Sequence, residues 1–189
     1  ESAQGMIELN VLSTVQLALA VLPRMVESAS GQIVVIGSIA GNLPAQGVAI
    51  YAATKAFVES FCRSTYRETR RSGVSVSLIK PGVVKTGFFR TAEMHSGRRT
   101  PFARHGVTAE RVARRVVGVM ARPRRLAYVP FYLRLVPLVE IVFGWLFDLA
   151  GPVDLGRRSG PRGPHQDPLP RHQAGPLGEQ VPVGHFGAC

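Results

Sequence analysis

Apolar and polar residues alternate along the first 150 positions with two periods, one typical of helices and one typical of strands. The pattern predicts helices over residues 4–28, 50–71 and 108–120, and strands over residues 32–37 and 74–79. Helices and strands that follow one another in this rhythm indicate an α/β fold with a parallel sheet. Ligands of such sheets bind beyond the carboxyl ends of the strands, so functional residues are expected there.

The burial expected for these elements also follows from the pattern. The first helix carries apolar residues on more than one face, which predicts that it is largely buried. The strand over residues 32–37 is apolar throughout, as is typical of a central parallel strand covered on both faces. On the helix over residues 50–71, Phe57 and Phe61 are expected to pack in the core or at a subunit contact, and Glu59 is expected to face solvent.

Residues 126–150 form an unusually apolar segment, interrupted by two prolines and three charged residues. A membrane-spanning helix needs roughly 20 mostly apolar residues, so these interruptions disfavour spanning. Three interpretations remain open. The segment holds a last strand over residues 127–129 and a packed helix, or it forms a pocket wall or oligomer contact, or it lies in a membrane surface beside a cluster of arginines.

The composition changes after Gly151. Residues 151–189 contain eight Gly and seven Pro, and such a sequence is not suited to a packed core. The sequence therefore predicts one partial domain over residues 1–150 and a disordered tail over residues 151–189.

The chain has a formal net charge of +11, and its cations are mostly arginines. A basic surface attracts nucleic acid or anionic lipid, but no zinc-finger or aromatic-interleaved pattern accompanies the charge, which disfavours nucleic acid. Cys62 and Cys189 form no C-x-x-C pair, so neither a metal site nor a disulfide framework is expected. The first residues lack the pattern of a signal peptide, and the expected setting is cytoplasmic.

Three residues carry the candidate chemistry. Ser38 follows the first strand, and Tyr51 and Lys55 lie four residues apart on the next helix, which places them on one face. A fixed ammonium beside a phenol favours the phenolate, and such a phenol exchanges a proton with a carbonyl or alcohol oxygen. Ser38 would hydrogen-bond the same oxygen. A hydride, which this set lacks, is supplied to proteins by a nicotinamide cofactor.

The spacing of Ser38, Tyr51 and Lys55 resembles the active site of the short-chain dehydrogenase/reductase family, in its single-domain NAD(P)-dependent branch. The resemblance covers about residues 1–150 and implies a Rossmann-like, doubly wound parallel sheet. It implies that Tyr51 is the acid/base, that Lys55 contacts the nicotinamide ribose and that Ser38 orients the substrate oxygen. By the same resemblance Asn10 distorts its helix and helps to hold a water linked to Lys55.

The segment from Lys80 to Thr86 resembles the turn of this family at the nicotinamide. The resemblance implies that Pro81 and Gly82 form the turn, and that the backbone of Val84 and the hydroxyl of Thr86 hold the carboxamide. The implied cofactor is NAD or NADP. The implied substrate is a small-molecule alcohol or ketone, and lipophilic compounds are among the candidates. A homo-oligomer is implied for the full-length protein, and residues 88–107 correspond to the substrate lid.

One departure from the family qualifies this assignment. No G-x-G-x-x-G or similar turn for the cofactor pyrophosphate occurs in the chain, which begins with Glu1. We therefore expect a catalytic half that begins inside a domain, lacks sheet strands and is weak or inactive alone. The alternative is a non-catalytic relative that acts as an interaction or lipid-surface module.

Overall fold

The computed structural model describes residues 2–43, 48–85 and 106–149. The chain divides into two units, Glu1–Gly151 and Pro152–Cys189, and every described residue belongs to the first. The predicted tail, nearly all of the predicted lid, and Thr86 lie outside the described residues.

Three parallel strands form the sheet, in the order β1-β2-β3. They are β1 (Gly31–Ile36), β2 (Val74–Pro81) and β3 (Leu126–Val129). Their parallel direction confirms the α/β fold, and β3 coincides with the last strand suggested by the sequence.

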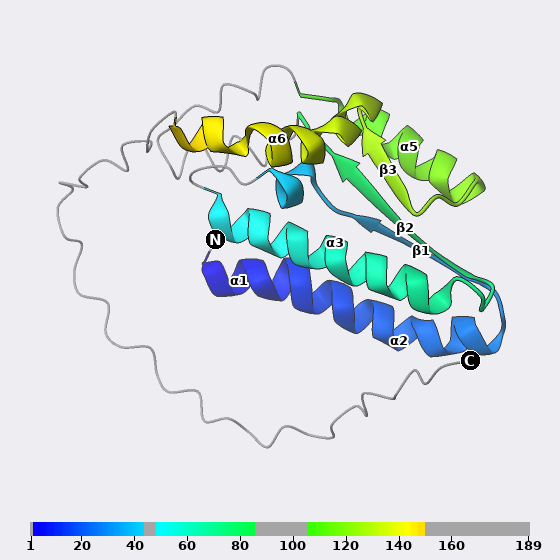
Figure 1. The fold of residues 1–189 in the computed structure, drawn as a ribbon. Helices are drawn as coiled ribbons and strands as arrows, with labels where there is room; N and C mark the ends of the chain where they lie inside the picture. The colour runs from blue at the N-terminus through cyan, green and yellow to red at the C-terminus, as the bar shows by residue number, and fades with distance from the viewer. Residues whose placement is uncertain (1, 44–47, 86–105, 150–189) are drawn as a thin grey trace, which may run out of the picture. The chain divides into compact units, whose positions relative to one another are not determined.

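Helices cover both faces of this sheet (Figure 1). One face carries α3 (Ala49–Thr69) and, beside it, a long helix that consists of α1 (Ala3–Ile7), a π-helical turn η1 (Glu8–Leu12) and α2 (Ser13–Glu27). The other face carries α5 (Ala109–Ala121), whose first turn is capped by the Thr108 hydroxyl. The doubly wound, Rossmann-like arrangement is thereby confirmed.

A small apolar cluster lies on each face of the sheet, because side chains of a strand point alternately to opposite sides. The cluster beneath α3 contains Val58, Cys62, Val76 and Leu78. The cluster beneath α5 contains Ile79, Val107, Val119, Ala127 and Val129. Cys62 is buried, as expected for a small packed side chain.

The turn between α3 and β2 depends on Gly73. Its φ is +77°, in the left-handed region, and a Cβ there would lie 2.0 Å from the carbonyl oxygen of Ala29. Only a glycine accepts both conditions without a shift of the backbone.

The prediction that the first strand is central and buried on both faces is wrong for the described part of the chain. β1 lies at the edge of the sheet, its first five residues are half-buried and Ile36 is exposed. The physical reason is that, among the described residues, only β2 pairs with β1, so one flank of the strand has no neighbour.

The prediction that the first helix is largely buried is also wrong. Between Ala3 and Glu27 only Val11, Ala18 and Leu22 are buried, because a single stripe of the helix faces α3 and the sheet. By length and composition alone, this stretch of 25 residues would suffice to cross a membrane, and no other described helix meets that criterion.

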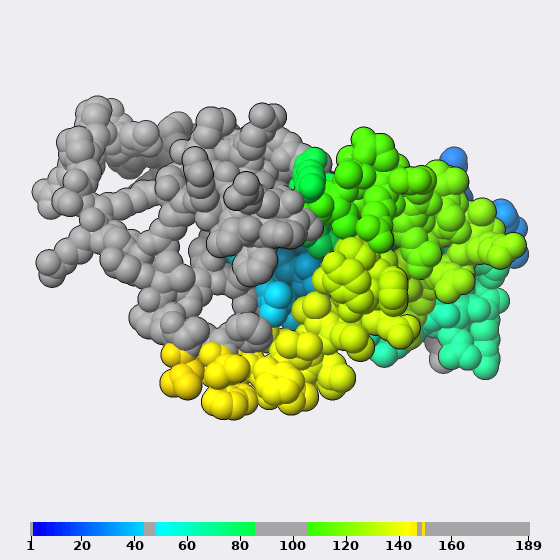
Figure 2. All heavy atoms as spheres, turned by 90° about the horizontal axis from the view of Figure 1, so that it is seen from above, coloured from blue at the N-terminus to red at the C-terminus, as the bar shows by residue number. Residues whose placement is uncertain are grey.

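The apolar segment after β3 folds into a 3-10 turn η4 (Phe131–Leu135) and α6 (Val136–Leu149). The helix contacts η2, the 3-10 turn over Ile39–Asn42, and η4. It is not the packed helix that one interpretation predicts, since Ile141 is 81% exposed and Trp145 63%. Figure 2 shows α6 in yellow and gold along one border of the described atoms.

Candidate active site

Ser38 lies directly beyond the carboxyl end of β1. Gly37 N–H donates to the Ile79 carbonyl over 2.8 Å, which aligns the end of β1 with the end of β2. The Ser38 hydroxyl oxygen accepts a hydrogen bond of 3.1 Å from Ala40 N–H and thereby caps η2. Because that bond uses an oxygen lone pair, the hydroxyl proton can still be donated to a ligand.

Tyr51 and Lys55 lie together on the first turns of α3. The Lys55 ammonium is 5.7 Å from the centroid of the Tyr51 ring, so the two side chains share a face as predicted. Lys55 is half-buried, and burial lowers its pKa from the ordinary value of 10.5. A partly dehydrated ammonium next to a phenol interacts with it more strongly than an ammonium in water does.

Gly41 brings η2 against α3 at the level of Lys55. A Cβ at this position would lie 2.9 Å from the backbone nitrogen of Ala56 and 3.0 Å from the carbonyl oxygen of Lys55. Any larger side chain would push η2, and Ser38 with it, away from the helix. The sequence indicates only a loop glycine here, because the close approach depends on packing between two elements.

Asn10 lies within the π-helical turn η1, so the helix is distorted at this residue, as the resemblance implies. Its side-chain amide donates a 3.2 Å hydrogen bond to the Thr54 hydroxyl, which donates over 2.8 Å to the Tyr51 carbonyl. Asn10 is thus connected to α3 at Thr54, which lies between Tyr51 and Lys55. The water linked to Lys55 stays a prediction.

The sequence gives little sign of Thr54. It is 4% exposed and forms both of these hydrogen bonds. A threonine in the middle of an otherwise regular helix is the only signal, and such residues often bond to the carbonyl one turn before.

The turn after β2 contains Pro81, Gly82 and Val84. Gly82 N–H donates to the Val129 carbonyl over 2.9 Å, which ties the turn to β3. Val84 forms a parallel bridge with Val107, whose hydrogen bonds are made by Val83 and Lys85 on either side. The N–H and C=O of Val84 itself therefore point away from Val107, and they remain suited to a ligand amide.

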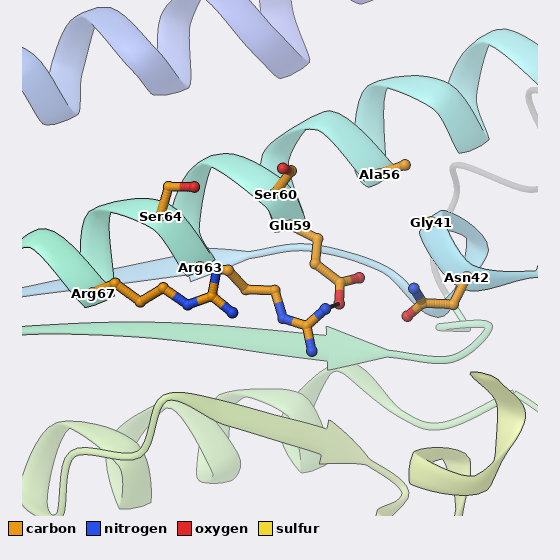
Figure 3. A pocket seen from close by; sticks show the side chains of 8 residues that line it. All are labelled: Gly41, Asn42, Ala56, Glu59, Ser60, Arg63, Ser64 and Arg67. Atoms are coloured by element: carbon orange, nitrogen blue, oxygen red, sulfur yellow. Dashed lines mark ion pairs between the residues drawn. The ribbon is translucent and has the colours of Figure 1, made fainter. Parts of the chain in front are cut away.

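Two buried charged residues lie near Lys55: Glu59, one helical turn further along α3, and Lys80, at the end of β2. The prediction that Glu59 faces solvent is wrong, since it is 6% exposed and forms an ion pair with Lys80, the residue before Pro81. Its other oxygen lies 3.5 Å from an Arg63 nitrogen, and both side chains line a pocket of about 290 Å³ (Figure 3). Phe57, expected to pack, is 48% exposed in the described chain.

The buried charges change the acidity of their neighbours. Burial lowers the pKa of Lys80, while the hydrogen bond and charge of Glu59 oppose that change. Burial and the charge of Glu59 raise the pKa of the Cys62 thiol to about 12. The Lys80 ammonium also lies 5.5 Å from the ring centroid of Tyr128, on the neighbouring strand.

Comparison with known proteins places this arrangement in context. An uncharacterized oxidoreductase of Staphylococcus aureus is 31% identical over 122 residues, which are 65% of this chain and 50% of the relative. A similar protein of Myxococcus xanthus is 41% identical over 86 residues, 46% of this chain and 34% of the relative. The chain thus spans about half the length, or less, of these curated relatives.

Solved structures with the same fold include a short-chain dehydrogenase from Sphingobium yanoikuyae in complex with NADPH. It has a TM-score of 0.62 and 29% identity, covering 82% of this chain and 61% of the other. Serine dehydrogenase in its closed form with NADP+ has a TM-score of 0.56 and 31% identity, covering 67% and 54%.

The family model described as short chain dehydrogenase matches residues 1–96, just over half of the 189 residues. The matched range contains β1, η2, α3 and β2, and it includes Ser38, Tyr51 and Lys55. The chain belongs to the short-chain dehydrogenase family.

Proposed function

We propose that the protein is an NAD(P)-dependent oxidoreductase that interconverts an alcohol and a carbonyl compound. The observation that carries the proposal is the Tyr51–Lys55 pair on α3, at the edge of the sheet where Ser38 follows β1. A phenol, an ammonium and a hydroxyl at the carboxyl ends of parallel strands fit a reaction that moves a proton at an oxygen atom.

Each side chain has a separate task in this proposal. In the direction of reduction, the Tyr51 phenol donates its proton to the carbonyl oxygen, and in oxidation the phenolate accepts the proton of the alcohol. The Lys55 ammonium stabilises the phenolate electrostatically, and the Ser38 hydroxyl donates a hydrogen bond that fixes the substrate oxygen. The nicotinamide, when bound, supplies or accepts the hydride at the substrate carbon.

The described residues fit such a cofactor at its nicotinamide end. The N–H and C=O of Val84 suit a carboxamide, Pro81 and Gly82 shape the turn, and Thr86 is proposed to contribute its hydroxyl. Lys55 would hydrogen-bond the ribose, as would Tyr51. The complexes of related structures with NADPH and with NADP+ support a nicotinamide dinucleotide, NAD or NADP.

Asn10 and Thr54 support this site through their hydrogen bonds to α3. We assign Asn10 to a proton relay through a water linked to Lys55, and Thr54 to fixing the side chain of Asn10. A cytoplasmic setting and a homo-oligomer complete the proposal for the whole protein; the chain itself spans about half the length of the curated relatives that it matches.

The test is Tyr51→Phe in the full-length protein, assayed by NADH and NADPH absorbance with a panel of small and lipophilic ketones and alcohols. We expect kcat to fall by about 10²–10⁴-fold, since the proton donor is lost while the ring is kept. Tyr66→Phe is the matched control, because Tyr66 lies on the same helix and its ring faces Arg125. Full activity in Tyr51→Phe would refute the proposed chemistry.

A second candidate is a non-catalytic interaction or lipid-surface module, favoured by the exposed apolar side chains of α6. α6 has 14 residues, about 21 Å at the rise of an α-helix, which is shorter than the ~30 Å hydrocarbon core and suits surface contact. Binding to anionic vesicles that survives Tyr51→Phe and weakens with salt would support this candidate over the enzyme.

A further inference from the structure

Glu59 continues a stripe of polar residues along α3. Tyr51, Lys55 and Glu59 follow one another at intervals of four residues, so they lie on the same face, with neighbouring Cβ atoms roughly 5–6 Å apart. Helical side chains lean toward the amino end, which directs the Glu59 carboxylate toward Lys55. A carboxylate in this position would be expected to pair with the Lys55 ammonium.

Glu59 pairs elsewhere in the structure. One carboxylate oxygen binds Lys80, whose side chain is completely buried, and the other faces Arg63 at 3.5 Å, as the dashed line in Figure 3 marks. Both oxygens are therefore occupied by cations from β2 and from the next turn of α3. Among the described residues, Lys80 and Arg63 are the ion-pair partners of Glu59, and Lys55 is not.

Stability alone is a weak reason for such a pair. Removing two charges from water is costly, and replacing a buried ion pair by apolar residues is often neutral or stabilising. The place of the pair is more informative, because Lys80 immediately precedes the Pro81–Gly82 turn and Glu59 lies one turn from Lys55. The ion pair thus joins the two segments that line the proposed nicotinamide site.

We propose that Lys80 is a positioning residue, which holds the Glu59 carboxylate away from Lys55 and so keeps the Lys55 ammonium beside Tyr51. If Lys80 is removed, Glu59 turns to Lys55, and the new ion pair draws the ammonium away from the phenol. This inference rests on the proposed function for its catalytic consequence, while the placement of the charges is independent of it.

The groups that face Lys55 and Glu59 come from three elements. Tyr51 and Arg63 lie on the same helix, Lys80 on β2, and Tyr128 on β3. Lys80 is the only one of these that is both cationic and fully buried, so its loss leaves Glu59 with Arg63, whose side chain is 46% exposed, as its remaining ion-pair partner.

The chain contains only three lysines, Lys55, Lys80 and Lys85, which permits a direct test. Protein labelled with ¹³C at lysine Cε gives three signals, assigned with Lys85→Arg and with Lys80→Met, and each signal is followed through a pH titration. In Lys80→Met we expect the Lys55 midpoint to rise by about one pH unit, because a nearby carboxylate favours the ammonium. The double variant Glu59→Gln/Lys80→Met should restore the original midpoint.

Two further variants keep the test decisive. Glu59→Gln alone should leave the Lys55 midpoint unchanged, since the carboxylate is already held elsewhere; a lower midpoint would overturn the proposal. Arg63→Met should also leave it unchanged, because Lys80 remains. The proposal would also be overturned by an unchanged Lys55 midpoint in Lys80→Met, or by a rise that persists in the double variant. If Lys80→Met does not fold, the Lys55 midpoint in Glu59→Gln decides the question.

Kinetics then separate this proposal from the proposed function. With an active protein, Lys80→Met should lower kcat about tenfold with little change in KM, and the double variant should recover most of the loss. If the full-length wild type shows no oxidoreductase activity, the proposed function fails while the titrations still decide the placement of Glu59. A loss of kcat that the double variant does not recover would overturn the positioning role.

Discussion

Thr54 joins two helices at the centre of the candidate site. It is almost fully buried, accepts from Asn10 and donates to the carbonyl of Tyr51, so its hydroxyl carries the only described hydrogen bond between the Asn10 side chain and α3. A residue with this role acts on the chemistry through its neighbours and not by contact with a substrate.

Replacing Thr54 by valine keeps the shape and removes the hydroxyl. We expect the free energy of unfolding to fall by about 1–3 kcal/mol, because the Asn10 amide loses its acceptor, and kcat to fall by about tenfold or more. Urea unfolding and steady-state kinetics measure the two effects. Thr69→Val is the matched control: Thr69 is also buried and donates to a helix carbonyl, but lies far along α3. Equal losses of kcat in both variants would contradict the prediction.

Lys55 gives a prediction about pH. Because burial lowers its pKa below 10.5, the unfolded chain binds more protons than the folded chain between the folded-state pKa and 10.5. Stability therefore rises with pH across that window, and the full cost of the buried charge is present below it. We expect Lys55→Met to raise the free energy of unfolding at neutral pH, with a gain that shrinks toward pH 10.5.

Urea titrations between pH 7 and pH 10 measure this difference. Lys85→Met is the control, since Lys85 is exposed and its replacement removes a lysine without changing a buried site. A Lys55→Met variant that is less stable than the wild type at neutral pH would contradict the prediction.

The placement of Tyr51 and Lys55 on one helix face, and of Ser38 just after a strand, could be predicted from their spacing in the sequence. Glu59 and Lys80 could not, since they are 21 positions apart and meet only when α3 packs on β2. A charged residue is expected to face solvent when only its own helix is considered. An oppositely charged partner on another element allows it to be buried instead.

At the scale of elements, the borders of helices and strands were predicted to within about two residues, whereas their surroundings were not. Burial of β1 and of the first helix depends on which elements cover them. The apolar pattern indicates only that some element should cover them. In the described chain, the outer flank of β1 and most of α2 have no cover.

Two glycines offer a matched pair of substitutions. Gly73→Ala should lower the free energy of unfolding by at least about 1–2 kcal/mol, because its positive φ and its contact with Ala29 both oppose a Cβ. Gly118→Ala should raise it by about 0.5–1 kcal/mol, since Gly118 lies within α5 and a Cβ there meets nothing within 4 Å. Thermal and urea unfolding test both, and changes of the same sign would contradict the prediction.

At the scale of the whole molecule, exposed apolar surface is concentrated on the first helix and on α6. Monomeric soluble proteins rarely leave such continuous patches uncovered, so a covering partner is expected for each. Since the resemblance implies a homo-oligomer for the full-length protein, we predict that a second copy covers the first helix.

Self-association tests this expectation on α2. Leu17 is 69% exposed, and Leu17→Glu places a charge in the proposed contact. We expect it to weaken association by at least about tenfold in sedimentation experiments, whereas Gln16→Glu, at an exposed polar position beside it, should have little effect. A wild type that stays monomeric at all concentrations would contradict the prediction.

The π-helical turn over Glu8–Leu12 has the effect of one inserted residue. Ile7, four positions before buried Val11, is 44% exposed, while Met6, five positions before it, is half-buried, so the helical phase changes across the turn. If the same residues formed an ordinary α-helix, the part before the turn would rotate by about 100°, the angle of one residue, relative to α2, and Asn10 would no longer point in its present direction relative to Thr54. The number of residues in this turn, as much as their identity, is therefore a requirement of the candidate site.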